Sequence, residues 1–239
     1  MKRKIITTSD GSKTIQIEDW NEQYHSIHGA IQEANHVFIK HGLLFYFQNC
    51  HRELVPRSQP ISILEIGFGT GLNAFLTFLK VDELLQPINY VAVEAYPVNV
   101  EEIQQLNYVE LISEKHKAEF EKIHSVPWEE QYSVSPTFTL EKQKKFFKDI
   151  TDENRFNIIY FDAFGARVQP ELWTEYIFSI MYKALRDNGV LVTYSAKGSV
   201  RRAMQAVGFT VERLPGPPGK REMLRARKMR SKYSANVER

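Results

Sequence analysis

Three glycines at every second position, Gly67, Gly69 and Gly71, follow a short apolar run and constrain this chain more than any other segment. The apolar run 61–66 has the length of a strand, and the amphipathic stretch from Leu72 onward predicts a helix. Glycine permits positive φ and a close approach of a ligand to the backbone, while the first turn of a helix offers unpaired N–H groups. The segment therefore predicts a strand, a tight turn and a helix, which is the shape of a nucleotide-binding site.

The spacing of this turn discriminates between nucleotides. A dinucleotide fingerprint has its third glycine three residues after the second, whereas Gly71 comes two residues after Gly69. Glu65 precedes the turn, where a carboxylate would repel a pyrophosphate but pair with a cation such as the α-amino group of S-adenosylmethionine. The motif therefore favours S-adenosylmethionine over a nicotinamide or flavin nucleotide. The alternative, a tight turn that binds no ligand, stays open.

Apolar runs and helical patterns alternate along the chain after the glycine turn. We expect strands at 89–94, 137–140, 157–162, 190–196, 209–213 and 222–227, and helices at 98–106, 170–185 and 200–207. Such alternation predicts a mostly parallel sheet that is covered on both faces. A loop rich in proline and glycine separates the last two strands, which are expected to be antiparallel. The polar stretch 106–136 is interpreted as an inserted helical segment over the sheet edge.

The chain before the glycine turn predicts a smaller unit. Residues 4–17 alternate around Asp10-Gly11, which is a strong indication of a β-hairpin. A helical pattern follows through Val37, Phe38 and Phe47. We interpret residues 1–55 as an N-terminal hairpin and helical lid, 56–230 as the main α/β domain, and 231–239 as a disordered tail.

Composition limits the class of protein. The 239 residues suffice for one α/β domain with an appendage, and no apolar run approaches the length of a membrane span or a signal peptide core. We therefore expect a cytoplasmic protein without membrane contact. Cys50 is the only cysteine, and none of the seven histidines forms a metal-binding helix motif with a neighbouring glutamate, so we expect no metal.

The net charge of +2 conceals a strong asymmetry. From Lys197 onward the chain has twelve lysines and arginines against three acids, a charge of +9, which leaves about −7 on residues 1–196. A basic end on an acidic body suggests that a polyanion docks at one place. A solvated basic tail without a partner is the alternative.

Two further acids follow apolar runs that are expected to be strands. Because ligands bind outside the carboxyl ends of the strands in open α/β sheets, Glu94 is placed to accept the hydroxyls of a ribose. Asp162 ends the apolar run 157–161, where an unpaired carboxylate would be costly without a partner. Such a carboxylate could orient an amine and take its proton during methyl transfer. Helix capping is the alternative role for both acids.

Several motifs together resemble one family, the tRNA 5-methylaminomethyl-2-thiouridine methyltransferases. This family comprises the methyltransferase half of the bifunctional enzyme MnmC and its stand-alone form MnmD. The similar stretches cover the chain nearly end to end. They are Glu22-x-Tyr24-His25-Ser26-x-x-Gly29-Ala30-x-x-Glu33, Glu65 to Asn73, Glu94-Ala95-Tyr96-Pro97, Phe161 to Phe164, Pro170 to Trp173, Ser195 to Arg202 and Pro217 to Leu224.

The resemblance implies a fold and an activity. The expected fold is a Rossmann-like class I S-adenosylmethionine-dependent methyltransferase, with a seven-stranded, mostly parallel sheet whose last strand is antiparallel. The implied reaction methylates 5-aminomethyl-(2-thio)uridine at the tRNA wobble position and releases S-adenosylhomocysteine. Because the sequence ends before a flavin-dependent domain could begin, we expect an aminomethyl substrate and no FAD. The resemblance implies no stable protein partner.

The resemblance also implies a set of site residues. Those expected at the cofactor are Tyr24, Ser26, Glu65, Gly67, Phe68, Gly69, Gly71, Leu72, Asn73, Glu94 and Asp162, with Asp162 also catalytic. Those expected at the tRNA anticodon stem-loop are Phe164, Lys197, Arg201, Arg202, Lys220, Arg221 and Arg225. Phe164, Tyr24 and Trp173 are candidates for stacking on the target base, although core packing is the favoured role of Trp173.

Two rival functions remain at this point. One is another amine-alkylating enzyme of the same fold, such as a polyamine aminopropyltransferase, which would not need the basic end. The other is a non-catalytic RNA-binding protein that kept the fold, and such a protein would not bind S-adenosylmethionine.

Overall fold

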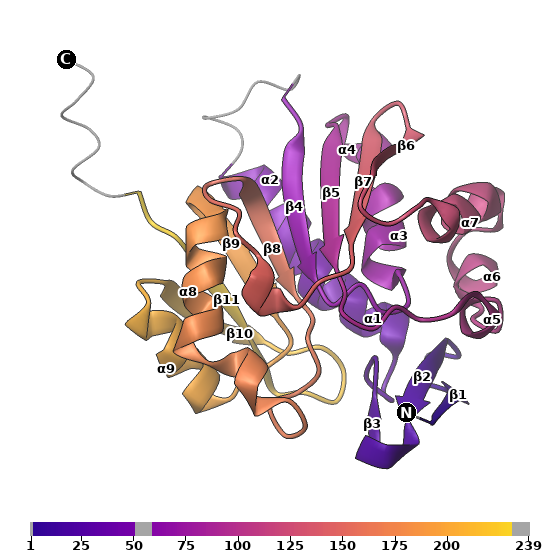
Figure 1. Ribbon diagram of the computed structural model, residues 1–239, viewed down its shortest axis with the longest axis horizontal. Helices are drawn as coiled ribbons and strands as arrows, with labels where there is room; N and C mark the ends of the chain where they lie inside the picture. Colours follow the sequence, from indigo (N-terminus) through magenta and orange to yellow (C-terminus); the bar gives the residue numbers. More distant parts are fainter. Residues whose placement is uncertain (1, 51–58, 231–239) are drawn as a thin grey trace.

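An eight-stranded sheet forms the centre of the protein. The computed structural model describes residues 2–50 and 59–230, so the expected boundary at residues 55 and 56 and the expected tail 231–239 lie outside the described residues. The strands are β4 (Ile61–Ile66), β5 (Ile88–Val93), β6 (Gln131–Ser135), β7 (Phe138–Gln143), β8 (Phe156–Phe161), β9 (Leu185–Thr193), β10 (Thr210–Pro215) and β11 (Glu222–Arg227). They lie in the order β10-β11-β9-β8-β4-β5-β7-β6 (Figure 1).

The directions of the strands confirm the expected Rossmann-like sheet. Strands β9, β8, β4, β5 and β7 run parallel, and the last strand, β11, is antiparallel to both of its neighbours. The edge strand β6 is an eighth strand that the sequence did not predict. It pairs antiparallel with β7 and buries only Val134, so it lacks the apolar alternation that marks a half-buried strand.

Side chains alternate between the two faces of the sheet and form a hydrophobic core on each. Ile63 and Tyr160 pack on one face, and Leu64 and Phe161 pack on the other. Helices α3 (Leu72–Phe78) and α7 (Lys117–Ser125) lie on the first side of the sheet, opposite α8 (Glu175–Ala184) and α9 (Gly198–Ala206) (Figure 1). The period-two burial is what fixes the register of such a sheet.

The remaining helices are short or belong to the N-terminal part. They are α1 (Ala30–Ala34), a π-helical stretch (Asn35–Leu44), α2 (Phe45–Asn49), α4 (Val81–Leu84), α5 (Val100–Ile103) and α6 (Tyr108–Ile112). The first three are consecutive and contribute Val37, Phe38 and Leu43 to the core of the first face. Trp173 ends the 3₁₀ turn Pro170–Trp173, directly before Thr174, the N-cap of α8, and is buried in the core as expected. Among the described residues, no helix is long and apolar enough to cross a membrane.

The predicted N-terminal hairpin is present as part of a separate three-stranded sheet. Its strands are β1 (Arg3–Thr7), β2 (Lys13–Ile17) and β3 (Glu22–Gln23). Asp10, in the turn of the hairpin, accepts hydrogen bonds from the Ser12 backbone at 3.1 Å and from the Gln32 backbone at 3.0 Å. The second bond satisfies a free N–H in the first turn of α1, so the turn attaches the hairpin to the helix. This sheet lies below one end of the main sheet (Figure 1).

Candidate active site

A cavity of about 730 Å³ opens at the carboxyl ends of β4, β5 and β8. This volume is typical of sites for small molecules. Eight of the residues expected at a site line it. They are Tyr24, Ser26, Gly67, Gly69, Glu94, Asp162, Phe164 and Lys220. Segments from the N-terminal sheet to the loop between β10 and β11 therefore converge on one chamber.

The glycine turn forms one wall of this chamber. Gly67, Gly69 and Gly71 have φ values of 90°, 50° and 71°, a region that side chains other than glycine rarely adopt. A Cβ atom on Gly67 would lie 2.8 Å from the backbone oxygen of Asp162. Glycine is therefore needed at position 67 both for its φ and for the close packing of the turn against the end of β8. The exposed backbone that results is the kind of surface that a nucleotide approaches closely.

Glu94 lies beside the turn at the end of β5. Its carboxylate accepts hydrogen bonds from the backbone of Gly69 at 3.2 Å and of Tyr96 at 2.9 Å. These two bonds hold the side chain against the cavity and leave lone pairs free on both oxygens. The position of Glu94 at the end of β5 and its free lone pairs fit a carboxylate that accepts hydrogen bonds from the two hydroxyls of a ribose.

Glu65 occupies a different place from the one that the sequence predicted. Its side chain is fully buried, does not line the cavity, and has no hydrogen-bond partner for either oxygen among residues 2–50 and 59–230. Burial raises the pKa of Glu65 well above its usual range. A carboxyl that is buried and does not line the cavity does not fit the predicted direct ion pair with a cationic cofactor group. The pleat of β4 directs the side chain at position 65 into the interior of the protein. The motif alone does not show to which face of the strand this side chain points.

Four other residues expected at the cofactor also lie behind the cavity wall. Phe68, Gly71, Leu72 and Asn73 do not line the cavity, and the side chains of Phe68, Leu72 and Asn73 are buried. Asn73 nevertheless acts on the site, because its Nδ2 donates a hydrogen bond of 2.9 Å to Oδ2 of Asp162. This hydrogen bond orients the Asp162 carboxylate.

Asp162 is the central acid of the cavity. It follows β8, and its backbone N–H donates to the Ile66 carbonyl at 2.9 Å, which fixes it beside the glycine turn. Burial, together with the nearby Glu33, raises the pKa of its carboxyl to about 7 against the lowering effects of Asn73 and Lys220. A carboxyl with this pKa is divided between its two protonation states near neutral pH, as a group that exchanges protons there should be.

Glu33 and Lys220 form an ion pair inside the cavity. Glu33, only 5% exposed, accepts a hydrogen bond from the Ser26 backbone at 2.8 Å and from Lys220 Nζ at 2.5 Å. Glu33 belongs to the first of the stretches that resemble the methyltransferase family, but the sequence does not predict that it lies at the site. The pattern Glu33–Phe38 also fits an ordinary amphipathic helix, so the sequence does not show that this glutamate faces a cavity.

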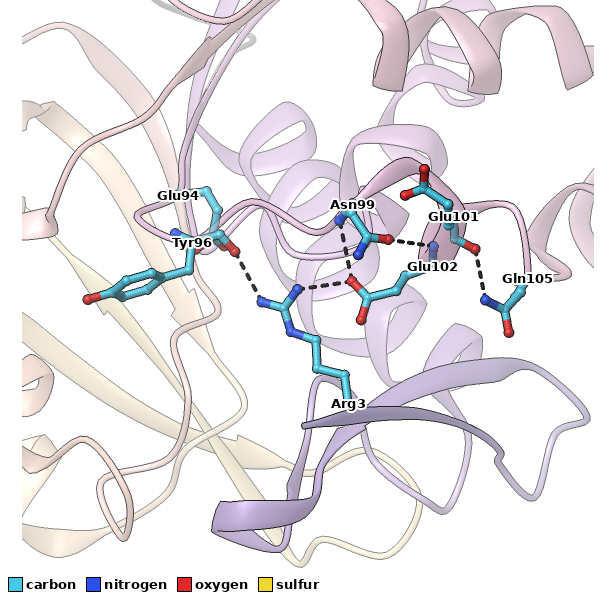
Figure 2. Close-up of polar contacts among 7 residues, drawn as sticks. All are labelled: Arg3, Glu94, Tyr96, Asn99, Glu101, Glu102 and Gln105. Carbon is cyan, nitrogen blue, oxygen red and sulfur yellow. Dashed lines mark hydrogen bonds and ion pairs between the residues drawn. The ribbon is translucent and has the colours of Figure 1, made fainter. Parts of the chain in front are cut away.

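The N-terminal sheet reaches the site through Arg3, which was not predicted. Figure 2 shows Arg3 between the loop after β5 and the start of α5. Its guanidinium lies 3.0 Å from Glu102 Oε2 and 3.4 Å from the carbonyl of Tyr96. Glu102 is itself fixed, because Asn99 and Glu102 form a capping box at the start of α5. Arg3 therefore connects the first strand of the protein to the loop that carries Glu94.

Aromatic side chains also line the cavity, and one of them, Tyr24, lies against Gly69 of the glycine turn. The rings of Tyr24 and Phe164 lie 4.9 Å apart edge to face, and Trp20 contacts Phe164 at 5.7 Å. Trp173 does not line the cavity, but its indole N–H donates to the Phe164 carbonyl at 2.7 Å. Tyr24 and Phe164 are thus available to a base in the cavity, and Trp173 supports them from the core.

The residues predicted to bind phosphate fall into three groups. Lys197, Arg202 and Arg221 are exposed and outside the cavity, with Arg201 partly buried near them in the sequence. Lys220 lies inside the cavity. The prediction for Arg225 is wrong, because β11 buries this residue to 7% exposure, where it pairs with Glu212 at 2.7 Å and covers the Phe45 ring.

No group of three or more metal-binding side chains occurs within the described parts of the chain. His25, one of the histidines that line the cavity, shares a hydrogen bond of 2.9 Å with the Thr14 hydroxyl. Burial lowers the pKa of His25 to about 4, so it is neutral at physiological pH. The polar groups that line this cavity include carboxylates, backbone amides, the guanidinium of Arg3 and the ammonium groups of Lys148 and Lys220, and such a set suits an organic ligand.

Comparison with families of known proteins adds an independent observation. A family model described as S-adenosyl-L-methionine-dependent methyltransferase matches residues 101–229, more than half of the chain. A curated relative is the tRNA 5-methylaminomethyl-2-thiouridine biosynthesis bifunctional protein MnmC of Paraburkholderia xenovorans, 26% identical over 219 residues. The protein of the same name from Leptospira borgpetersenii is 28% identical over 219 residues. Both alignments cover 86% of this chain and 32% of the relative, so the chain spans about a third of their length.

Solved structures are similar over nearly the whole chain. The crystal structure of MNMC2 from Aquifex aeolicus has a TM-score of 0.76 at 25% identity and covers 96% of this chain and 71% of that one. Spermidine synthase from Thermotoga maritima has a TM-score of 0.53 at 15% identity, covering 95% of this chain and 73% of that one. The second likeness concerns the fold alone.

Proposed function

The chain belongs to the S-adenosyl-L-methionine-dependent methyltransferases, and we propose that it methylates the amine of 5-aminomethyl-(2-thio)uridine at the wobble position of tRNA. The observation that carries this proposal is the position of Asp162, a carboxyl with a pKa of about 7, beside the glycine turn and Glu94. The names of the curated relatives support the choice of substrate. The same relatives favour tRNA over a polyamine as the acceptor.

We propose a separate role in methyl transfer for each of several cavity residues. Bound S-adenosylmethionine would supply an activated methyl group, with its ribose on Glu94 and its chain along the backbone of Gly67 and Gly69. The acceptor nitrogen needs a free lone pair, so an aminomethyl group that arrives as an ammonium must lose a proton before it attacks. The bond between sulfur and the methyl carbon would break, with its electron pair left on sulfur, as the new N–C bond forms. Asp162 is placed to take that proton and to orient the nitrogen. Asn73 holds the carboxylate in position through its 2.9 Å hydrogen bond.

The base would enter the cavity from the tRNA. Selective modification of one nucleotide requires the base to leave its stack and to enter a pocket that binds its faces and edges. Tyr24 and Phe164 offer ring faces and edges for this purpose. Lys197, Arg201, Arg202 and Arg221 are proposed to contact phosphates of the anticodon stem-loop, which would contribute affinity and little sequence choice.

The direct test of the function is nucleoside analysis. We expect purified protein with S-adenosylmethionine to add one methyl group to 5-aminomethyluridine in tRNA, detected by mass analysis of the digested RNA. Absence of the methylated nucleoside would contradict the proposed substrate. The non-catalytic alternative is tested by calorimetric titration with S-adenosylhomocysteine, and no detectable heat up to millimolar ligand would favour that alternative.

Arg221 and Arg225 give a matched test of the basic surface. Arg221→Met should weaken tRNA binding and reduce its salt dependence, by about 0.7–0.9 in the slope of log K against log salt, because one phosphate contact is lost. Arg225→Met should leave that slope unchanged. Instead it should lower the free energy of unfolding by roughly 1–3 kcal/mol, because the charged hydrogen bond between the buried Arg225 and the partly exposed Glu212 is lost.

Filter binding across a salt series and urea denaturation measure the two quantities. An unchanged slope in Arg221→Met would show that the tRNA docks on another surface. A reduced slope in Arg225→Met would reverse the structural assignment of this residue.

A further inference from the structure

Lys220 is the only lysine of the loop between β10 and β11, and its side chain, 31% exposed, lines the cavity. Its Nζ lies 2.5 Å from Glu33 and 3.8 Å from the centroid of the Tyr194 ring. A surface lysine that contacts phosphates would extend into water, where it could reach the RNA backbone. The ion pair and the ring contact hold this ammonium at the wall of the chamber instead.

A chain of contacts places this ammonium close to the acid of the site. The Tyr194 hydroxyl donates a hydrogen bond of 2.8 Å to the carbonyl of Ala163, the residue that follows Asp162. Lys220 packs over the ring of the same tyrosine, and both Lys220 and Asp162 line the cavity. The site therefore presents an acceptor and a donor side by side, Asp162 and Lys220.

The ammonium of Lys220 has one N–H group that its contacts with Glu33 and Tyr194 do not use. It carries three N–H groups and no acceptor. Glu33 accepts one, and the Tyr194 ring face meets another in a cation–π contact. A third donor remains for a molecule that enters the cavity.

The edge of the proposed substrate has the complementary pattern. In 5-aminomethyluridine the aminomethyl group is attached to C5, and the neighbouring C4 carries the acceptor O4. The corresponding cytosine carries an amino donor at C4. An amine held by Asp162 would therefore bring either O4 or a competing N–H group toward Lys220.

We propose that Lys220 is a specificity-determining residue that donates a hydrogen bond to O4 of the target base, so that the cavity accepts an aminomethyl uracil and rejects the cytosine analogue. Glu33 and Tyr194 hold the ammonium in place for this contact. The inference rests on the proposed function and adds the feature of the base that is recognised.

The experiment measures the methylation of two substrates by the wild type and by each variant. Anticodon stem-loops that differ only in carrying 5-aminomethyluridine or 5-aminomethylcytidine at the wobble position are methylated by the wild type, Lys220→Met and Arg221→Met. The measured quantity is the ratio of kcat/KM for the two substrates. Because both rates come from one preparation, the ratio does not depend on the fraction of folded protein.

The wild type should prefer the uridine substrate by about 100-fold or more, since a donor opposite a donor leaves both unpaired. Lys220→Met should lower activity on uridine by about 10- to 100-fold and bring the ratio close to one. Arg221→Met, the control in the same loop, should slow both substrates equally and keep the ratio. Lys220→Gln, which retains an uncharged donor, should give an intermediate ratio.

The possible results separate this inference from the proposed function. A wild-type ratio that persists in Lys220→Met and Lys220→Gln would overturn it and leave Lys220 a structural role in fixing the loop. A wild type that methylates both substrates equally would also overturn it, while the proposed methylation of uridine would stand. A wild type that methylates neither substrate would refute the proposed function, and the inference with it.

Discussion

Asp162→Asn is expected to reduce single-turnover methylation of tRNA by about 10²- to 10⁴-fold, the range typical of a lost proton acceptor. The variant keeps the shape of the side chain and can still accept the hydrogen bond from Asn73, but it cannot take a proton from the amine. Binding of S-adenosylhomocysteine should persist. In the wild type the rate should rise with pH through about 7, because only the ionised Asp162 accepts the proton.

The same substitution should stabilise the protein without ligand. The pKa of Asp162 is raised from its usual 3.8 to about 7 in the folded chain, so the folded state binds more protons than the unfolded state between these values. Stability is therefore lost as the pH rises from about 4 to about 7, and the full cost is present above 7. Asparagine does not ionise, so the variant does not lose this stability. The unfolding free energy of Asp162→Asn at pH 8 should exceed that of the wild type by roughly 2–4 kcal/mol, and the difference should vanish below about pH 4.

Rapid-quench methylation assays and urea denaturation at pH 4 and pH 8 measure the two effects. Retained single-turnover activity would remove Asp162 from the proton step. Equal stability of the two proteins at pH 8 would show that the carboxyl is well solvated, which contradicts a raised pKa.

Gly67→Ala is expected to lower the affinity for S-adenosylhomocysteine by more than about 10-fold and the free energy of unfolding by roughly 2–4 kcal/mol. The added Cβ would meet the backbone oxygen of Asp162 at 2.8 Å, and the residue has a φ of 90°. Backbone atoms cannot rotate away as a side chain can. The turn must therefore move relative to the end of β8, which displaces both the glycine wall and Asp162.

Gly11→Ala is the matched control for this prediction. Gly11 has a similar φ of 82°, but its added Cβ would meet no atom within 4 Å. Gly11→Ala should lower the free energy of unfolding only by the backbone strain of about 1–2 kcal/mol, and it should leave the affinity for S-adenosylhomocysteine unchanged. Calorimetric titration measures the affinity of both variants for S-adenosylhomocysteine, and denaturation measures their free energies of unfolding. The comparison separates the effect of backbone strain, which both variants have, from the effect of the Cβ clash, which only Gly67→Ala has. Equal affinities in Gly67→Ala and the wild type would show that the turn does not contact the cofactor.

The sequence predicted the fold well because burial on both faces leaves continuous apolar runs. Strands β4 and β8 have six buried residues each, and a tight turn with three glycines follows the first of them. Strand β6 was missed because an exposed edge strand is stabilised by its ladder of hydrogen bonds, which any polar sequence can form. The hairpin at Asp10-Gly11 was predicted since its turn chemistry is local.

The site was predicted less completely, because its residues come together only in the tertiary structure. Asp162 and Glu94 were found from their place at strand ends, a rule that depends on topology alone. Arg3 and Glu102 are 99 positions apart, and no local pattern connects them. Arg225 and Lys220 look alike as basic residues near the C-terminus, yet the pleat of β11 buries one and the loop turns the other into the cavity.

Arg3 and Lys220 line the same cavity although they lie near opposite ends of the described chain. The chamber therefore exists only when the first strand and the last loop have both docked on the central sheet. A ligand that binds it stabilises the complete native state over every partly folded one, by RT ln(1 + [L]/Kd). Cofactor would thus sharpen the cooperativity of unfolding, and protection of the N-terminal sheet from hydrogen exchange would rise together with that of the β10–β11 loop.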